Sequence, residues 1–257
     1  MLHIVQYCNR AQHLEAVKIC SKTTGQFALL GSKYRRRHTT GENKNKTTVI
    51  YNGLGLKKNI KPLDIKTIWN IPKNHVVFVA AGRLVPQKGF DLLIDAANRL
   101  KRSARPFTLL IAGMGKDRKS LQEKIVLNKL SNVKLIGFQN NLPPILKASD
   151  YVIMPSRQEG MPNVVMESMA LGKSVLAAKV NGVSELMDHN RTGYIFDPMK
   201  VKPILDAMNF VLDNHGSEKI INWGLLAKDH IKNNFRLDKM IDHLESYFYD
   251  QYAQSYR

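Results

Sequence analysis

The stretch VVFVAAGRLVPQKGFDLLIDAANRLKR, residues 76–102, decides the fold. It begins with an apolar run rich in β-branched residues over 76–82, which predicts a buried strand, and continues through a glycine-containing loop. In its second half, over 90–102, apolar side chains recur in the spacing of one helix face: Leu93, Ala96, Ala97 and Leu100. The stretch therefore predicts a strand, a loop and an amphipathic helix in succession.

The same succession recurs along the chain. Further apolar runs predict strands, separated by helical patterns such as 119–130, and residues 200–250 predict two or three final helices; the strands are 107–113, 133–138, 151–155, 173–178 and 193–196. Near-continuous apolar strands that alternate with helices indicate a parallel sheet buried on both faces. We therefore expect an α/β fold with a Rossmann-like, doubly wound parallel sheet, which binds ligands at the carboxyl ends of its strands.

Residues 1–60 have a different pattern. We expect a helical segment before residue 16, a strand over 16–20 and a second helical segment over 21–34. The run RRRHTTGENKNK, residues 35–46, has no apolar periodicity and predicts an exposed basic loop, and TTVIYNG, residues 47–53, predicts a strand that ends in an Asn-Gly turn. This region is too short for a second complete domain.

Composition narrows the classes of function. The formal net charge is +18, and residues 1–65 hold twelve Lys or Arg against three acids, so a partner of opposite charge is expected. Two cysteines, Cys8 and Cys20, and no signal-peptide or membrane-spanning stretch indicate a cytoplasmic protein in a reducing compartment. Scattered histidines and cysteines predict no metal site.

Charged and small residues follow the first major strand. Gly82 allows a tight exit from the strand, and Arg83 and Lys88 lie five residues apart in the loop. A guanidinium fork and an ammonium group together suit a phosphate or diphosphate. A solvated basic loop is an equally good interpretation of this spacing, because Lys and Arg are abundant in the chain.

The next two strand ends carry weaker signals. Gly113 belongs to a Gly-x-Gly in AGMGKD, residues 112–117, which is either a plain strand-to-helix turn or a ligand contact. Phe138, in GFQNN, is either a core or rim aromatic residue or a stacking platform. Neither residue identifies a ligand without its context.

The segment SRQEGMPNVVMES, residues 156–168, places one glutamate in a loop and another in a predicted helix. Glu159 precedes that helix and Glu167 lies inside it, about 12 Å apart at helical rise. Carboxylates accept hydrogen bonds from sugar hydroxyls, so the two could grip both ends of an elongated ligand. The alternative is a surface loop residue and a solvated helix residue.

Six motifs in a fixed order resemble the donor-binding half of retaining glycosyltransferases with the GT-B fold, glycosyltransferase family 4 (the glycosyl transferases group 1 domain). The resemblance covers roughly residues 48–250. Its motifs are Gly-Arg-Leu with Lys-Gly-Phe-Asp, Ala-Gly-Met-Gly, Gly-Phe, Pro-Ser-Arg-Gln-Glu-Gly-Met-Pro with Met-Glu-Ser-Met-Ala-Leu-Gly, Asn-Gly-Val-Ser-Glu, and Arg-Thr-Gly-Tyr.

The resemblance implies a role for each site residue. Arg83 and Lys88 would bind and stabilise the departing diphosphate, Glu159 would face the transferred sugar, and Glu167 would hold the ribose hydroxyls. Catalytic roles thus fall to Arg83, Lys88 and Glu159. The other expected substrate contacts are Gly82, Gly113, Phe138, Gly160, Met161, Pro162 and Asn163. The donor would be a UDP- or GDP-linked sugar, with no metal and no cofactor.

The resemblance also implies a hexosyl or N-acetylhexosaminyl transferase of surface polysaccharide or lipopolysaccharide synthesis, acting on a glycan or lipid-linked acceptor. We expect residues 1–48 to be a remnant of the acceptor domain with a basic linker, 49–235 the donor-binding domain, and 236–257 a C-terminal helix. His3 and His13 match no motif, so no active-site histidine is expected.

The small amino-terminal region leaves two alternatives to a complete enzyme. The chain would be a donor-binding module without turnover of its own, or one subunit of a split enzyme whose partner chain supplies the acceptor domain. The basic excess suits the anionic inner face of a membrane. Nucleic-acid binding is a third reading, which the absence of basic-aromatic interleaving or a recognition helix disfavours.

Overall fold

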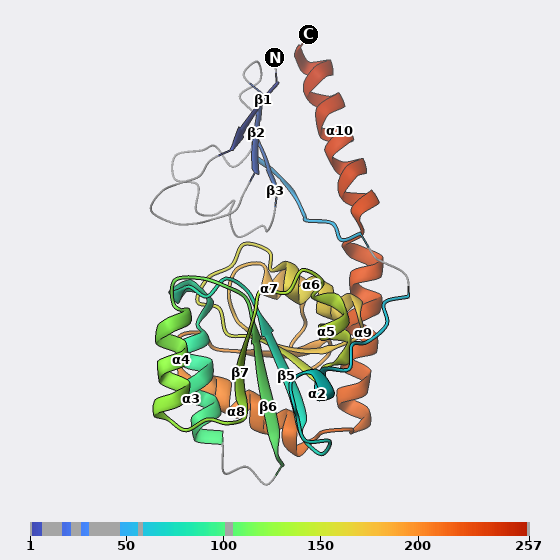
Figure 1. Cartoon of the computed structure of the whole chain (residues 1–257). Coiled ribbons are helices and arrows are strands. Elements are labelled where there is room, and N and C mark those ends of the chain that lie inside the picture. The colour runs from blue at the N-terminus through green and yellow to red at the C-terminus, as the bar shows by residue number, and fades with distance from the viewer. Residues whose placement is uncertain are drawn as a thin grey trace.

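The computed structural model of this 257-residue chain describes residues 2–6, 17–21, 27–30, 47–55, 59–100 and 105–255 (Figure 1). Its larger part is built on a six-stranded sheet in which every pair of neighbours is parallel. The strands are β5 (Val76–Ala81), β6 (Phe107–Ala112), β7 (Val133–Gly137), β8 (Tyr151–Met154), β9 (Ser174–Ala178) and β10 (Gly193–Phe196). All six lie where the apolar runs predict them.

Helices cover both faces of this sheet (Figure 1). On one side α3 (Phe90–Leu100) packs on α8 (Val201–Asp213), with α4 (Arg118–Leu127) beside α3. On the other side lie α5 (Pro143–Ala148), α6 (Asn163–Ala170), α7 (Val183–Leu186) and α9 (Glu218–Asn234), and α6 packs on α9. A short helix, α2 (Ile65–Ile68), precedes β5. The doubly wound parallel fold is thereby confirmed.

The core forms because the strands are apolar along their whole length. Val77, Phe78 and Val79 in β5 are fully buried, since helices cover both sides of the sheet. Helix α3 buries the same stripe that the sequence places on one face, including Leu93, Ala96, Ala97 and Leu100. Alternating strands and amphipathic helices thus bury a single continuous core.

The strand order fixes where a ligand can bind. The order is β10-β9-β8-β5-β6-β7, so the chain winds outward from β5 in one direction and later returns to its other side with β8. The carboxyl ends of β5 and β8 are therefore the switch point of the sheet, beside which a fold of this kind binds its ligand. The predicted phosphate loop follows β5 and the predicted glutamate loop follows β8.

The amino-terminal region corrects two predictions. It forms a four-stranded sheet in the order β1-β2-β3-β4, made of β1 (Leu2–Gln6), β2 (Val17–Ser21), β3 (Phe27–Leu30) and β4 (Thr47–Ile50). The strands at 16–20 and 47–53 are confirmed within a few residues. The helix predicted over 21–34 is wrong at Phe27–Leu30, and Leu2–Gln6 form a strand where a helical segment is expected before residue 16; the rest of that segment, residues 7–15, lies outside the described residues. Four apolar residues in β3 are too few for a stable helix, whereas strands on both sides satisfy their backbone groups. Residues 35–46, the basic loop, lie outside the described residues.

A short segment joins the two sheets and is held by the carboxyl end of the chain. Leu54 donates its backbone N–H to the carbonyl of Phe235 (2.8 Å), and its own carbonyl accepts from Leu237, the first residue of α10 (Leu237–Ser255). Farther along, Tyr247 of α10 packs on Ile50 of β4. Within the described ranges, no helix combines the length and the hydropathy that crossing a bilayer requires.

Candidate functional site

The loop after β5 is folded tightly against the loop after β8. Lys88 ends a single 3₁₀ turn (Pro86–Lys88), and its aliphatic stem packs on Gly82, where an added Cβ would lie 3.5 Å from Lys88 Cδ. Gly89 follows with φ +69°, and a Cβ there would lie 2.3 Å from the carbonyl oxygen of Pro155. Only glycine permits this approach, so residue 89 brings the two loops into direct backbone contact.

This contact pairs two of the predicted catalytic residues. Lys88 Nζ lies 2.7 Å from Glu159 Oε1, and the hydroxyl of Ser156 donates to the same oxygen at 2.6 Å. The Glu159 residue is only 8% exposed, so its carboxylate is held in a partly desolvated place where a charged hydrogen bond is strong. The pair lies at the carboxyl ends of β5 and β8, near which the strand order predicts a ligand.

A second ion pair fastens the same two loops from outside. Arg157 reaches the carboxylate of Asp91 with both terminal nitrogens, at 2.8 and 2.7 Å, and also donates to the carbonyl of Pro86. Partial burial alone would raise the pKa of Asp91, but the hydrogen bonds and charge of Arg157 outweigh it and lower that pKa. The backbone N–H of Arg157 also donates to Gln87 (2.8 Å), so the junction is braced by main chain and side chain together.

Beside this junction lies a cavity of about 420 Å³ at the ends of β5, β6 and β7. Four predicted site residues line it: Gly82, Arg83, Gly113 and Phe138. Its floor is bare backbone, because Gly113 has φ +144° and a Cβ there would lie 1.8 Å from the carbonyl oxygen of Gly82. Phe138 is 65% exposed, so its ring belongs to the rim of the cavity and not to the core.

Glu167 lines a different cavity, of about 660 Å³, together with Pro143 and Lys147. Burial raises the pKa of the Glu167 carboxyl. The two cavities adjoin, because Val164 and Glu167 are one turn apart on α6 and line one cavity each. The structure thus brings Lys88 against Gly82 and Glu159, with Arg83 lining the cavity beside them, whereas Glu167 lines the other cavity.

The start of α6 completes the loop after β8. Met161 and Pro162 are buried and Asn163 is exposed. Gly160 packs on Gly182, where an added Cβ would lie 2.0 Å from the Gly160 carbonyl oxygen. As the sequence predicts, Glu159 precedes the helix and Glu167 lies inside it.

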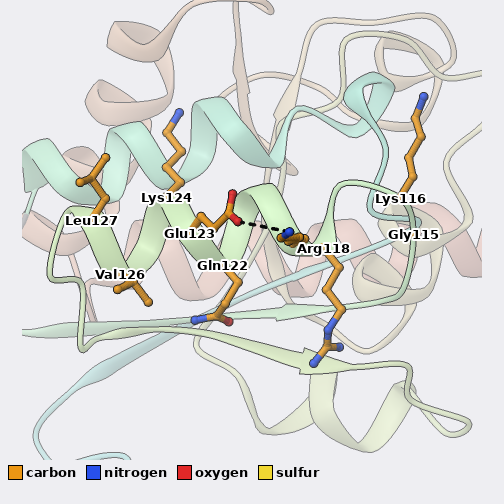
Figure 2. A pocket seen from close by; sticks show the side chains of 9 residues that line it. Gly115, Lys116, Arg118, Gln122, Glu123, Lys124, Val126 and Leu127 are labelled. Atoms are coloured by element: carbon orange, nitrogen blue, oxygen red, sulfur yellow. Dashed lines mark ion pairs between the residues drawn. The ribbon is translucent and has the colours of Figure 1, made fainter.

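A larger hollow, about 1010 Å³, lies on the outer face of α4 and holds none of the predicted site residues. Figure 2 shows that its walls come from this one helix and the turn before it, with Lys116, Arg118 and Lys124 directed apart. An ion pair joins Lys119 and Glu123 along the helix (4.0 Å). Volume alone therefore does not mark the site here. Among the described residues no group of three or more His, Cys, Asp or Glu is placed to hold a metal ion.

Sequence reasoning missed several parts of the site. Ser156 and the Arg157–Asp91 clamp join residues far apart in the chain, and no local pattern announces such pairs. Leu142 and Val164 line the cavity beside Arg83 although both look like ordinary core positions. The close approach of Gly182 to Gly160 could have been predicted in part from the sequence, because a glycine directly before a predicted helix often adopts a positive φ.

Known proteins resemble this chain in sequence and in structure. The sequence pattern of the family described as "Glycosyl transferases group 1" matches residues 63–224. A UDP-Gal:alpha-D-GlcNAc-diphosphoundecaprenol alpha-1,3-galactosyltransferase from Escherichia coli is 28% identical over 214 residues, which are 80% of this chain and 54% of that protein. The chain spans about half the length of the curated relatives it matches.

Solved structures agree on the fold. A glycosyltransferase from Rickettsia africae superposes with a TM-score of 0.79 at 20% identity, over 86% of this chain and 62% of the other. HepE of Anabaena, crystallised with UDP and glucose, superposes with a TM-score of 0.75 at 24% identity, over the same shares of the two chains. Since the family pattern matches well over half of its residues and the fold agrees, this chain belongs to the glycosyl transferases group 1 family.

Proposed function

We propose that this chain is the donor-binding part of a retaining glycosyltransferase. It moves a hexose or N-acetylhexosamine from a nucleoside diphosphate sugar to a glycan or lipid-linked acceptor in surface polysaccharide synthesis. The observation that carries the proposal is the Lys88–Glu159 pair at the carboxyl ends of β5 and β8, next to the cavity that Arg83 lines. The name of the Escherichia coli relative, which includes a UDP-sugar and a lipid diphosphate, supports the substrate class.

The proposed mechanism follows from where charge develops. Breaking the bond to the anomeric carbon leaves positive character on the sugar ring and negative charge on the departing diphosphate. Arg83 and Lys88 stabilise that negative charge, while Glu159 faces the sugar. At an effective dielectric constant of about 20, a pair of unit charges about 4 Å apart is worth about 4 kcal/mol, so each cation contributes substantially without a metal ion.

In the proposed mechanism, retention of the anomeric configuration requires the acceptor hydroxyl to attack from the face that the diphosphate leaves. The departing phosphate oxygen takes the acceptor's proton, so no protein base is needed. Glu159 is suited to orienting the sugar hydroxyls, since its Oε1 is already fixed by Lys88 and Ser156. The ribose role of Glu167 remains part of the proposal, with the ribose reaching over the start of α5 from one cavity to the next.

A donor-binding module without turnover of its own is the second candidate. The observation in its favour is coverage, because the chain aligns with 54% of the Escherichia coli relative and the rest of that protein has no counterpart in the alignment. In this case a partner chain or a further domain would supply the acceptor side. The proposed surface for the donor is the same in both candidates.

Titration calorimetry with UDP-glucose, UDP-galactose, UDP-N-acetylglucosamine and GDP-mannose tests donor binding, and release of free nucleotide tests turnover. Arg83→Ala should weaken binding or turnover by about a hundredfold, because a cation that meets the diphosphate is lost. Arg99→Ala is the matched control, since Arg99 is exposed on α3 and lines none of these cavities.

Binding with turnover supports the enzyme, and binding alone supports the module. No binding of any of the four nucleotide sugars, combined with salt-sensitive binding of random duplex DNA, would overturn both. Flotation with anionic vesicles tests the proposed contact of this basic protein with the inner face of a membrane.

A further inference from the structure

The 3₁₀ turn after β5 holds the backbone of the loop after β8. The carbonyl of Gln87 accepts a hydrogen bond from the backbone N–H of Arg157 at 2.8 Å, and the Gln87 side-chain amide donates to the carbonyl of Gln158 at 3.0 Å. Arg157 and Gln158 lie between Ser156 and Glu159, so one residue of the turn fixes the main chain that joins these two. The freedom that remains to the Glu159 carboxylate is therefore rotation about its own side-chain bonds.

Ser156 restricts that rotation from within the loop. Its hydroxyl donates to Oε1 of Glu159, three residues further along the chain, at 2.6 Å. Ser156 is only 1% exposed, so water competes little for this hydrogen bond, and a carboxylate acceptor makes it stronger than a bond between neutral groups. The contact closes a small ring within residues 156–159 and fixes the direction of the carboxylate.

Both donors to the Glu159 carboxylate use the same oxygen. Lys88 Nζ lies 2.7 Å from Oε1, the atom that the Ser156 hydroxyl also contacts. Within the described residues, Oε2 of Glu159 has no hydrogen-bond partner and is not enclosed, so it belongs to the 10% of this side chain that is exposed. One oxygen of a fixed carboxylate is thus open to accept a hydrogen bond from a hydroxyl group.

The two donors differ in how they respond to an anion that binds nearby. The Lys88 side chain is 20% exposed and carries its charge on a flexible stem, so a diphosphate can draw the ammonium group away from Glu159. The Ser156 hydroxyl is uncharged, buried and attached directly to the Cβ of a loop residue. It therefore stays on Oε1 when the ammonium group turns to the anion.

We propose that Ser156 is a positioning residue, which keeps the Glu159 carboxylate in place independently of Lys88 and leaves Oε2 to meet a hydroxyl of the transferred sugar. The contact of Oε2 with a sugar rests on the proposed function, whereas the hold of Ser156 on Glu159 does not. Lys88 is then able to serve the diphosphate without releasing the carboxylate that faces the sugar.

Crystal structures of Lys88→Ala and of the double variant Lys88→Ala with Ser156→Ala test this hold directly. In the single variant we expect Oε1 of Glu159 to stay within about 3 Å of the Ser156 hydroxyl, since that hydrogen bond does not need the ammonium group. In the double variant the carboxylate loses both donors, so we expect it to move or to occupy more than one rotamer.

Kinetics of Ser156→Ala test the consequence for sugar transfer. Turnover should fall about tenfold, the effect of losing one hydrogen bond to a charged group, while KM for the donor changes by less than about threefold. This split is expected because Ser156 acts through Glu159 and is not itself a predicted donor contact. Ser156→Cys nearly keeps the side-chain volume but provides only a weak donor, so it should lose turnover as Ser156→Ala does.

Ser149→Ala is the matched control. Ser149 and Ser156 lie on either side of β8, and each is 1% exposed and donates one hydrogen bond. The Ser149 hydroxyl donates to the carbonyl of Leu146 at 2.8 Å, before the amino end of the strand and away from Glu159. Its removal should leave turnover of the folded protein within about twofold of wild type.

A carboxylate that keeps its place in Lys88→Ala and loses it in the double variant supports the proposal. The proposal is overturned if Glu159 moves away in Lys88→Ala although Ser156 is present, or stays in place without both donors. Full turnover by Ser156→Cys, or an equal loss in Ser149→Ala, would also overturn it, because volume or overall stability would then explain the effect. If the wild-type chain binds no nucleotide sugar, the proposed function fails, but the two structures still decide whether Ser156 holds Glu159.

Discussion

Two ion pairs join the same two loops, and they differ in how they do it. Lys88–Glu159 and Arg157–Asp91 both have a shortest distance of 2.7 Å. The inner pair is more buried, with side chains 20% and 10% exposed against 27% and 42% for the outer pair. The outer pair is a fork with two parallel bonds, whereas the inner pair is a single contact from an ammonium group.

The difference in geometry suggests different roles for the two ion pairs: Arg157–Asp91 suits a structural contact, and Lys88–Glu159 suits ligand binding. A guanidinium fork fixes both partners and suits a structural clamp. An ammonium group has three donors, and Lys88 uses one of them within the described part of the chain, which leaves donors for a ligand beside these strand ends. In the proposed function, the outer pair keeps the loops together while the inner pair meets the substrate.

The strongest test of this division is Lys88→Ala. We expect sugar transfer to fall about a hundredfold to a thousandfold, because charge on the leaving group loses a preorganised cation. The fold should persist, since Arg157 and the backbone contact at Gly89 still join the loops. Donor-dependent turnover and thermal unfolding measure the two effects, and near-normal turnover would remove Lys88 from the site.

Arg157→Ala should have the opposite profile. Loss of a two-pronged, partly buried contact is expected to lower the free energy of unfolding by about 1–2 kcal/mol. Turnover of the folded fraction should stay within about tenfold of wild type, as Arg157 supports the loop without meeting the donor. Urea unfolding and kinetics on the same sample decide the matter, and a complete loss of turnover would show that the outer pair is also catalytic.

The smallest expected effect is on pH dependence. Arg157 lowers the pKa of Asp91 below its usual value, against the effect of partial burial. A lowered pKa in the folded state stabilises the protein above the unfolded pKa of Asp, about 3.9, and that contribution is lost as pH falls through the folded pKa.

Because the Asp91 side chain is only partly buried and solvent screens its charge, we expect a loss of at most about 1 kcal/mol. Urea midpoints at neutral and strongly acidic pH, compared with those of Asp91→Asn, should show a shallower acid loss in the variant. An equal loss of stability at acidic pH in the wild-type protein and Asp91→Asn would mean that Arg157 does not stabilise the ionised form of Asp91.

The larger sheet could be predicted from the sequence because its signals are local. Each strand is an apolar run, and each helix repeats its stripe within a dozen residues, as Leu93, Ala97 and Leu100 do in α3. The helix predicted over 21–34 failed for the converse reason. Its apolar core, Phe27–Leu30, owes its extended form to pairing with Val17–Ser21 and Thr47–Ile50, which the local pattern does not contain.

The sequence predicted which residues belong to the candidate site, but not how they are arranged in space. Motif order named Lys88 and Glu159, but their pairing across 71 positions depends on β5 and β8 being neighbours. The division between the cavities of Arg83 and Glu167 depends on how α5 packs beside α6, which no spacing in the sequence encodes.

The backbone contact between Gly82 and Gly113 limits which substitutions can change the shape of the cavity. With the main chain of Gly82 and Gly113 in contact, no side chain can be added beneath a bound molecule without displacing a strand end. In the proposed function, a change of the accepted base or sugar would therefore come from side chains that line the cavity, such as the exposed Met114 and Phe138. Libraries that vary these two positions and spare the glycines would explore new donors on an unchanged scaffold.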